Sequence, residues 1–567
     1  MDKSIKKMIL FRLLKILPKK LLNNFYLLSG FTIIVGILET LSISLILPIV
    51  NSIFGNKDNF PINIQIVKDF FNQIDFSTLI IFFLIIFLIK NLFLVIFNWY
   101  LQKFLAKIKE NLSYRFYNNY FAQDYEKFKS LNSSQVIRNI ILEVNSFSAI
   151  FQNLLNLISE ALIILFILFF LFSYDFKITL SATFLILAVG IIYYVFFKNF
   201  LKKLGEQSVS FSKDVIKDIQ ESYVNFRIIK MLNQITYFSE DFMFKNLKSI
   251  NAMKMLSYVQ SLTRIWLETI LILAFVFMIF FFQKDGNLLS LNIAKLSFFF
   301  IASVKIIPSM NKIINFMQKL KYSNATINII LSEINKFYEP EFEKKINDIN
   351  FNFREDISLE NISFFYSDKK IINNLSLKIK DSEVILISGP SGVGKSTLIE
   401  LICGLIKPKE GYIYLGNKNI FDDLIKWQKN IAYIPQKTSL VQDTIENNIA
   451  FSSKKIKLKP NKEKIKNLIK LVNLEDFVQS TKNKHETIID ENFINISGGQ
   501  AQRIGIARAL YQNPEIIIFD ESFNSLDKDI AYKILSNVRQ EFKTAKILII
   551  SHDLYFEKLA DRTIRLE

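Results

Sequence analysis

Cysteine and histidine are almost absent from this sequence of 567 residues. Cys403 is the single cysteine, which excludes an intrachain disulfide and a cysteine-based zinc site. The histidines are His485 and His552. No A-x-A-like site follows the first apolar run, which starts near Phe25, so a cleavable signal peptide is not expected.

Hydrophobic residues and positive charge are both abundant. The sequence is 51% hydrophobic, contains 56 phenylalanines and has a formal net charge of +18. A polytopic membrane protein with basic cytoplasmic loops combines these features naturally. Basic stripes also bind nucleic acids, but the long apolar runs argue against a nucleic-acid partner.

Six apolar runs reach the roughly 20 residues that a helix needs to cross a bilayer. They cover residues 25–50, 78–101, 147–173, 177–198, 259–282 and 293–317. Buried helices of soluble proteins have shorter runs, of about ten to fourteen residues. From about Glu360, short β-rich runs alternate with helical stretches, which is typical of an α/β domain with a parallel core.

These patterns predict an all-α transmembrane domain of six helices followed by an α/β domain. The expected divisions are an amphipathic segment at 1–24, the transmembrane domain at 25–325, a linker at 326–350 and the α/β domain at 351–567. Lys and Arg concentrate before the first run and in the 2–3 and 4–5 connections, so both termini are expected in the cytoplasm. Residues 62–76 are either a short external helix on the outer leaflet or a surface loop.

A phosphate-binding loop occupies residues 389–397, where the sequence GPSGVGKST fits G-x-x-x-x-G-K-[ST] without a mismatch. Its glycines let backbone N–H groups approach phosphates, and the following helix adds a favourable dipole. Lys395 is expected to reach the β- and γ-phosphates of ATP, and Ser396 to bind Mg²⁺. Downstream, the apolar run 516–519 ends in Asp520, expected at the metal, and Glu521, expected at the attacking water.

Between these elements lies the pentapeptide ISGGQ, residues 496–500. In this order the three motifs resemble the ATP-binding cassette (ABC) superfamily, in which the pentapeptide contacts the γ-phosphate held by a second cassette. The resemblance implies a homodimer with two composite ATP sites, or a heterodimer with a related half-transporter. It also implies a switch role for His552, a loop glutamine at Gln436, adenine stacking on Tyr366 and a partner-facing loop at Asp527.

The expected site residues follow from these motifs and the resemblance. For nucleotide binding they are Tyr366, Gly389, Ser391, Gly392, Gly394, Lys395, Ser396, Thr397, Gln436, Ser497, Gly498, Gly499, Gln500, Asp520 and Asp527. The expected catalytic residues are Lys395, Glu521 and His552, and the expected Mg²⁺ ligands are Ser396, Gln436 and Asp520. The sequence departs from common exporters at 490–495, which lack glycine, at 522–524, and at Asp553, where arginine is frequent.

Three cations interrupt the apolar runs: Lys90, Arg264 and Lys305. Ionisable groups inside a bilayer normally face a cavity or a partner. In one reading they form a cationic ring for an anionic head group. In the other, Arg264 pairs with Glu268, and Lys90 or Lys305 snorkels or pairs with Glu160.

The stretches at 36–40, 124–128, 264–268 and 308–312 resemble those of the bacterial lipid-linked oligosaccharide flippases of protein N-glycosylation (the PglK type). That resemblance implies that the three cations serve the pyrophosphate of a polyprenyl-linked glycan at the bacterial inner membrane. Two of the cations here are lysines, which keep the charge but lose the bidentate geometry of arginine. The alternatives are an exporter of a lipid A-like lipid, a drug or a peptide, a soluble ABC ATPase and an ATP-gated channel.

Overall fold

The computed structural model describes residues 14, 16–45, 49, 75–174, 176–283, 289–335, 350–366, 369–390, 392–451, 460–489 and 496–566. In parts of the helices between residues 174 and 305 only the backbone is described, and Lys305 lies in such a part. The expected external helix at 62–76 and most of the amphipathic segment 1–24 lie outside the described residues. The chain forms two compact units, residues 1–123 with 130–339, and residues 124–129 with 340–567.

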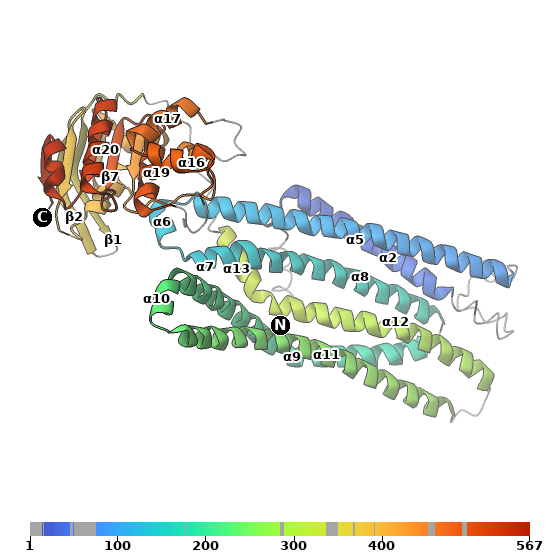
Figure 1. The fold of residues 1–567 in the computed structure, drawn as a ribbon. Coiled ribbons are helices and arrows are strands. Elements are labelled where there is room, and N and C mark those ends of the chain that lie inside the picture. The colour runs from blue at the N-terminus through green and yellow to red at the C-terminus, as the bar shows by residue number, and fades with distance from the viewer. Residues whose placement is uncertain are drawn as a thin grey trace. The chain divides into compact units, whose positions relative to one another are not determined.

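Long helices dominate the first unit (Figure 1). They are α2 (Lys19–Ser44), α5 (Phe76–Phe121), α8 (Val144–Tyr174), α9 (Phe176–Val224), α11 (Ile235–Gln283) and α12 (Leu289–Tyr322). Five of the expected spans lie wholly within one of these helices, and the first, 25–50, begins in α2. Three described stretches are long and apolar enough to cross a membrane: Lys19–Ser42, Phe76–Phe121 and Ser133–Ser173.

The apolar surface of α5 is far larger than the first unit covers. Its most apolar window has a mean hydropathy of 3.0, yet only 11% of that window is buried inside the molecule. Exposed apolar surface of this extent is unfavourable in water and favourable in a bilayer. The inner face of α5 packs instead on α2 and α8, where Phe104, Phe147 and Phe151 are buried.

Short helices join the long ones. α10 (Phe226–Met231) connects α9 to α11, which pack side by side along their length (Figure 1). α7 (Ser133–Arg138) and the π-helical turn η1 (Asn139–Glu143) lead into α8, and α13 (Asn324–Asn335) follows α12. α13 therefore occupies the start of the segment expected as a linker, because residues 324–335 continue a helical apolar face that packs on the core.

Two sheets form the second unit. The antiparallel sheet has the order β2-β1-β4-β5, with β1 (Ile357–Tyr366), β2 (Lys369–Ile379), β4 (Glu410–Leu415) and β5 (Lys418–Asn419). The parallel sheet has the order β6-β7-β8-β3-β9, with β3 (Val384–Ser388), β6 (Ile431–Ile434), β7 (Ile516–Asp520), β8 (Lys546–Ile550) and β9 (Arg562–Arg565). β3, β7 and β8 are the expected β-rich runs, and their near-complete burial explains their continuous Ile and Leu content.

Helices pack around these sheets. They are α14 (Lys395–Ile402), α15 (Leu424–Lys429), α16 (Ile445–Ala450), α17 (Lys462–Leu471), α18 (Glu475–Ser480), α19 (Gly498–Leu510) and α20 (Lys528–Glu541). Single 3₁₀ turns are η3 (Ile420–Asp423), η4 (Lys484–Glu486) and η5 (Leu554–Leu559). The short helix α6 (Tyr125–Lys129) also belongs to this unit, although it follows α5 in sequence.

Candidate functional site

The catalytic candidates follow the ends of neighbouring parallel strands. β6, β7, β8 and β3 are adjacent and parallel, so their carboxyl ends meet at one edge of the sheet. Ligands of open α/β sheets bind at this edge. The sequence positions after these strands are the loop with Gln436, the pair Asp520–Glu521, His552 and the phosphate-binding loop.

The phosphate-binding loop turns directly from the buried strand β3 into α14. Gly392 and Gly394 have φ values of 85° and 106°, in the left-handed region that favours glycine. The Lys395 side chain is buried beneath the loop, where its Nζ donates to the carbonyl oxygens of Gly389, at 2.8 Å, and Pro390, at 3.0 Å. The loop therefore places a cation and the first N–H groups of a helix together, which suits a phosphate.

Ser396 and Thr397 occupy the second and third positions of α14. Ser396 is exposed and available to a ligand, whereas Thr397 is buried. Ser391 lies outside the described residues.

Glu521 connects the catalytic candidates. Its Oε1 lies 3.2 Å from His552 Nε2, and its Oε2 accepts a hydrogen bond of 2.9 Å from Gln436 Nε2. His552 Nε2 also lies 3.2 Å from Lys395 Nζ. Glu521 adopts a φ of 47°, which is uncommon for a residue with a side chain and often marks functional sites. Gln436 and His552 thus meet at the Glu521 carboxylate, and His552 joins that carboxylate to Lys395.

Asp520 supplies the second carboxylate at the end of β7. Burial raises its pKa, and the hydrogen bond from Tyr433 Oη to its Oδ2, at 2.8 Å, acts in the opposite direction. A buried carboxylate with a raised pKa lacks compensating positive charge, which a divalent cation would supply. Oxygen donors from Ser396, Gln436 and Asp520 match the preference of Mg²⁺, so these residues fit that ion.

Tyr366 ends β1, and its ring packs edge-on against Phe364 at 4.9 Å between centroids. The Tyr366 hydroxyl donates to Glu400 Oε2 at 3.0 Å. Burial and the negative charge of Glu400 raise the pKa of Tyr366. The Tyr366 ring is half-buried, which leaves part of its surface accessible to a ligand.

The pentapeptide begins helix α19. Ser497 caps that helix in a capping box with Gln500, which satisfies backbone N–H groups at its start. A side-chain carbon on Gly498 would meet no atom within 4 Å, and one on Gly499 would meet Ser525 O at 3.3 Å. Among the described residues, Ser497 and Gln500 form hydrogen bonds with each other and not with the phosphate-binding loop.

Asp527 caps α20 by accepting a hydrogen bond of 3.0 Å from Asp529 N. Together with Ser525 it forms the loop that lies against Gly499. The pentapeptide and the Asp527 loop therefore form one surface.

Comparisons with known proteins agree with this geometry. Residues 372–524 match the profile of the family described as ABC transporter. The Rickettsia bellii protein named "Putative export ATP-binding/permease protein" is 26% identical over 94% of this chain and 92% of its own length. The "ATP-dependent lipid A-core flippase" of Paraburkholderia xenovorans is 27% identical over 78% of this chain and 73% of its own length. The ATP-bound structure of a bacterial Atm1-family ABC exporter superposes with a TM-score of 0.74 at 18% identity, covering 97% of this chain and 94% of that chain.

The chain has the fold of an ABC exporter half-transporter, and residues 372–524 match the ABC transporter family. The predicted fold class, a helical transmembrane domain followed by an ABC nucleotide-binding domain, is confirmed. The predicted enzyme class, an ATP hydrolase coupled to transport, is also confirmed. The oligosaccharide cargo, the individual site roles and the domain boundaries stay predictions.

Three contacts near the site cannot be predicted from the sequence motifs. Glu400 contacts Tyr366, and Tyr433 contacts Asp520, as described above. Gln502 is buried, donates to Pro435 O at 2.9 Å and thereby ties α19 to the loop that carries Gln436. These partners come from elements distant in sequence, so spacing alone does not reveal them.

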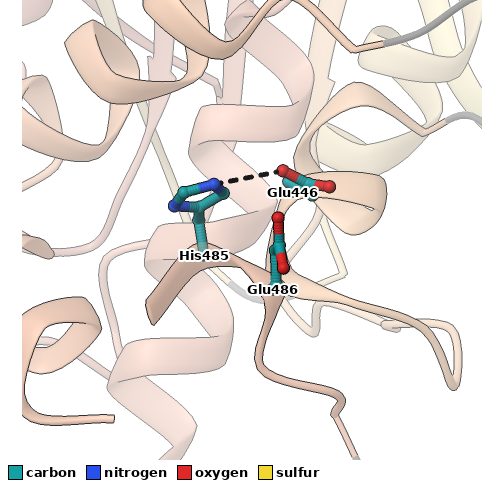
Figure 2. Close-up of side chains that lie close together, drawn as sticks. All are labelled: Glu446, His485 and Glu486. Carbon is teal, nitrogen blue, oxygen red and sulfur yellow. Dashed lines mark ion pairs between the residues drawn. The ribbon is translucent and has the colours of Figure 1, made fainter. Parts of the chain in front are cut away.

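The second histidine lies away from the catalytic edge. His485 in η4 forms an ion-pair contact of 3.5 Å with Glu446, and Glu486 lies beside them (Figure 2). Ligand atoms of these three side chains lie within 4.8 Å of one another. Lys462 contacts Glu486 at 3.4 Å, so protein cations already face the carboxylates of this cluster.

Lys90 and Arg264 have protein partners in the described part of the chain. Lys90 is 8% exposed, and its Nζ lies 3.3 Å from the buried carboxylate of Glu39. Arg264 binds Glu268 at 2.6 Å, while its side chain remains 71% exposed. Glu160, considered above for Lys90 or Lys305, binds Lys312 at 2.7 Å. The side chain of Lys305 lies outside the described residues.

Proposed function

We propose that two copies of the chain use ATP to flip a polyprenyl-pyrophosphate-linked oligosaccharide from the inner to the outer leaflet of the bacterial inner membrane. The convergence of Lys395, Glu521 and His552 at one sheet edge carries the ATP-dependent part. Exporter-like helices and the largely exposed side chain of Arg264 support the lipid-linked anionic cargo.

In this proposal Lys395 and the loop N–H groups bind the β- and γ-phosphates of ATP. A bound Mg²⁺, held by Ser396, Gln436 and Asp520, supplies charge neutralisation at those phosphates. Glu521 orients the attacking water and accepts its proton, and His552 holds Glu521 in place from the side of the γ-phosphate. Tyr366 stacks on adenine.

A homodimer completes the site. Within the described residues, Ser497 and Gln500 contact each other and not the phosphate-binding loop of their own chain, and we assign the contact with that loop to the pentapeptide of a second copy. Val224, just before α10, and Met231, at its end, are each 81% exposed in the described part of one chain. Exposed apolar patches of this kind mark interaction sites, and the second copy is the partner that the incomplete ATP site requires.

The orientation follows from charge and from the ATP supply. Lys and Arg are concentrated before the first span and in the 2–3 and 4–5 connections, which places these segments and both termini in the cytoplasm. The nucleotide-binding unit then meets cytoplasmic ATP.

Arg264 is the described cation best suited to an anionic head group. Its guanidinium binds Glu268 but leaves most of its side chain exposed, unlike the buried Lys90. Guanidinium groups bind phosphate oxygens in a bidentate manner. A lipid A-like cargo is the second candidate, because the Paraburkholderia relative named as a lipid A-core flippase aligns over 78% of the chain.

The ATP-dependent part is tested with Glu521→Gln in inverted membrane vesicles that contain a labelled lipid-linked glycan. We expect loss of ATP hydrolysis and of flipping, with ATP binding retained. Glu541→Gln, at the exposed end of α20, is the matched control and should behave as the unmodified chain. ATP-dependent flipping that continues in Glu521→Gln refutes the mechanism.

The cargo is tested with Arg264→Gln, with Glu268→Gln as its control and with the triple change of Lys90, Arg264 and Lys305 to Gln. We expect Arg264→Gln to slow flipping of the lipid-linked glycan, and Glu268→Gln to leave it intact or faster, because the guanidinium is then released. Unchanged flipping in the triple variant excludes the cationic ring. Flipping of lipid A alone by the unmodified chain selects the second candidate.

A further inference from the structure

Glu400 connects Tyr366 of β1 to Lys129 of α6 within the second unit, and the proposed catalytic mechanism uses neither contact. It lies on α14, the helix that begins with Lys395. Its carboxylate is 13% exposed and uses a different oxygen for each partner. Oε2 accepts from the Tyr366 hydroxyl at 3.0 Å, and Oε1 accepts from Lys129 Nζ at 3.1 Å.

Lys129 is the last residue of α6, which follows α5 in the chain after a short turn. Its ammonium also lies 5.7 Å from the centre of the Tyr366 ring, within the range of a cation–π contact. A second ion pair, Glu126 to Lys409 at 3.8 Å, holds α6 to the same unit without touching Tyr366. Of these two ion pairs, the one formed by Lys129 contacts the tyrosine.

The hydrogen bond to Glu400 and the packing on Phe364 together restrain the Tyr366 ring. A tyrosine has two side-chain torsions, and here the ring edge packs on Phe364 while the hydroxyl is tied to α14. A stacking surface that is already ordered before the ligand arrives loses less entropy on binding. The same bond couples the ring to the helix that carries the phosphate-binding lysine.

We propose that Glu400 is a positioning residue for ATP. Glu400 holds the Tyr366 ring in the position for stacking, and this position depends in turn on Lys129 of α6. The inference rests on the proposed role of Tyr366 in binding adenine. Because α6 is continuous in sequence with α5, displacement of α6 by cargo would loosen Lys129 from Glu400 and weaken ATP binding. By linkage, bound ATP would favour the docked position of α6.

The test is a double-mutant cycle on the full-length purified transporter in lipid nanodiscs, with the KM for ATP as the readout. Tyr366→Phe keeps the ring and removes the hydroxyl, and Glu400→Ala removes the carboxylate. We expect each to raise KM about two- to tenfold, the usual effect of one hydrogen bond, with kcat nearly unchanged. The double variant should be no worse than the more affected single variant, because both changes break one bond. Additive effects on KM overturn the inference.

Further variants separate the parts of the proposal. Glu400→Gln keeps an acceptor for Tyr366 but loses the charge that holds Lys129, so it should match Lys129→Met, with a smaller rise in KM than Glu400→Ala. If Glu400→Ala fails to fold, as judged by gel filtration, the comparison of Glu400→Gln with Lys129→Met decides. Unequal effects of these two then overturn the inference.

Glu126→Gln is the matched control, since it breaks the other ion pair of α6 and should leave KM for ATP unchanged. An equal rise in KM in Glu126→Gln and Lys129→Met would show that α6 docking in general is responsible, and would overturn the role of Glu400. Tyr366→Ala tests the underlying assignment. If it leaves KM unchanged, the proposed adenine role of Tyr366 fails, whatever Glu400 does.

Discussion

The buried pair Lys90–Glu39 makes a prediction about the stability of the transmembrane unit. The two side chains are 10% and 9% exposed, and their charged atoms are 3.3 Å apart. The Lys90 ammonium also lies 4.3 Å from the centre of the Phe87 ring. Removal of one partner from such a pair leaves an uncompensated buried charge and costs about 3–5 kcal/mol.

We therefore expect Lys90→Met and Glu39→Gln each to lower the folded-to-unfolded ratio by about a hundredfold or more. The double variant, Lys90→Met with Glu39→Gln, buries no charge and should recover most of that loss. Because large membrane proteins unfold irreversibly, the half-life of ATPase activity at a fixed elevated temperature is the suitable measurement.

An exposed pair provides the control. Lys217 and Glu221 lie 3.5 Å apart with side chains 50% and 52% exposed, and Lys217→Gln should cost at most about 1 kcal/mol. If the double variant at Lys90 and Glu39 is as unstable as both single variants combined, the two charges do not compensate each other, and the reasoning is wrong.

The same pair bears on the cargo. Exchange of the two charges, Lys90→Glu with Glu39→Lys, keeps an ion pair in the core of the unit. If the exchanged variant is stable and still flips an anionic lipid, Lys90 acts in the fold and not on the head group. A stable exchanged variant that no longer flips the lipid places Lys90 in cargo recognition.

Further predictions concern the nucleotide-binding unit. Burial raises the pKa of Cys403 to about 12, so a maleimide should leave the native protein unlabelled and label it fully after denaturation. Tyr433→Phe removes a bond that orients Asp520, and the Mg²⁺ concentration for half-maximal ATPase activity should rise about tenfold while nucleotide binding without Mg²⁺ is unchanged. Ser497→Ala removes the cap of α19 and should destabilise the unit by about 1 kcal/mol in chemical denaturation, whereas Ser497→Thr should retain stability.

The helices of the first unit can be predicted from the sequence where they contain long apolar runs. Runs of about twenty apolar residues give the positions of the spans, because the bilayer sets that length. They do not give the continuation of α9 to Val224 or the start of α11 at Ile235, since these charged segments have no long apolar run. Apolar runs do not predict the helix at residues 326–335 either, because α13 is short and its apolar face is recognised only from its packing.

The nucleotide site can be predicted from the sequence because its motifs follow strands whose ends can themselves be predicted. Each motif follows a buried strand, and parallel strands bring their carboxyl ends to one edge, so the meeting of Lys395, Glu521 and His552 follows from the order of motifs. The partners Glu400 and Gln502 lie on helix faces, where no repeating pattern distinguishes a functional side chain from a solvated one. Their roles require the actual packing of α14 and α19.

Ion pairs in the transmembrane unit can likewise be predicted from sequence within one helix but not between helices. Described pairs inside the expected spans include Arg264–Glu268, Lys312–Glu160 and Lys90–Glu39. The first joins residues four apart on one helix, where spacing alone predicts contact. The other two join different helices, and their partners depend on the rotation and height of each helix. A count of cations in apolar runs therefore overstates the charge available to cargo, because each distant carboxylate that reaches a cation removes it from the count.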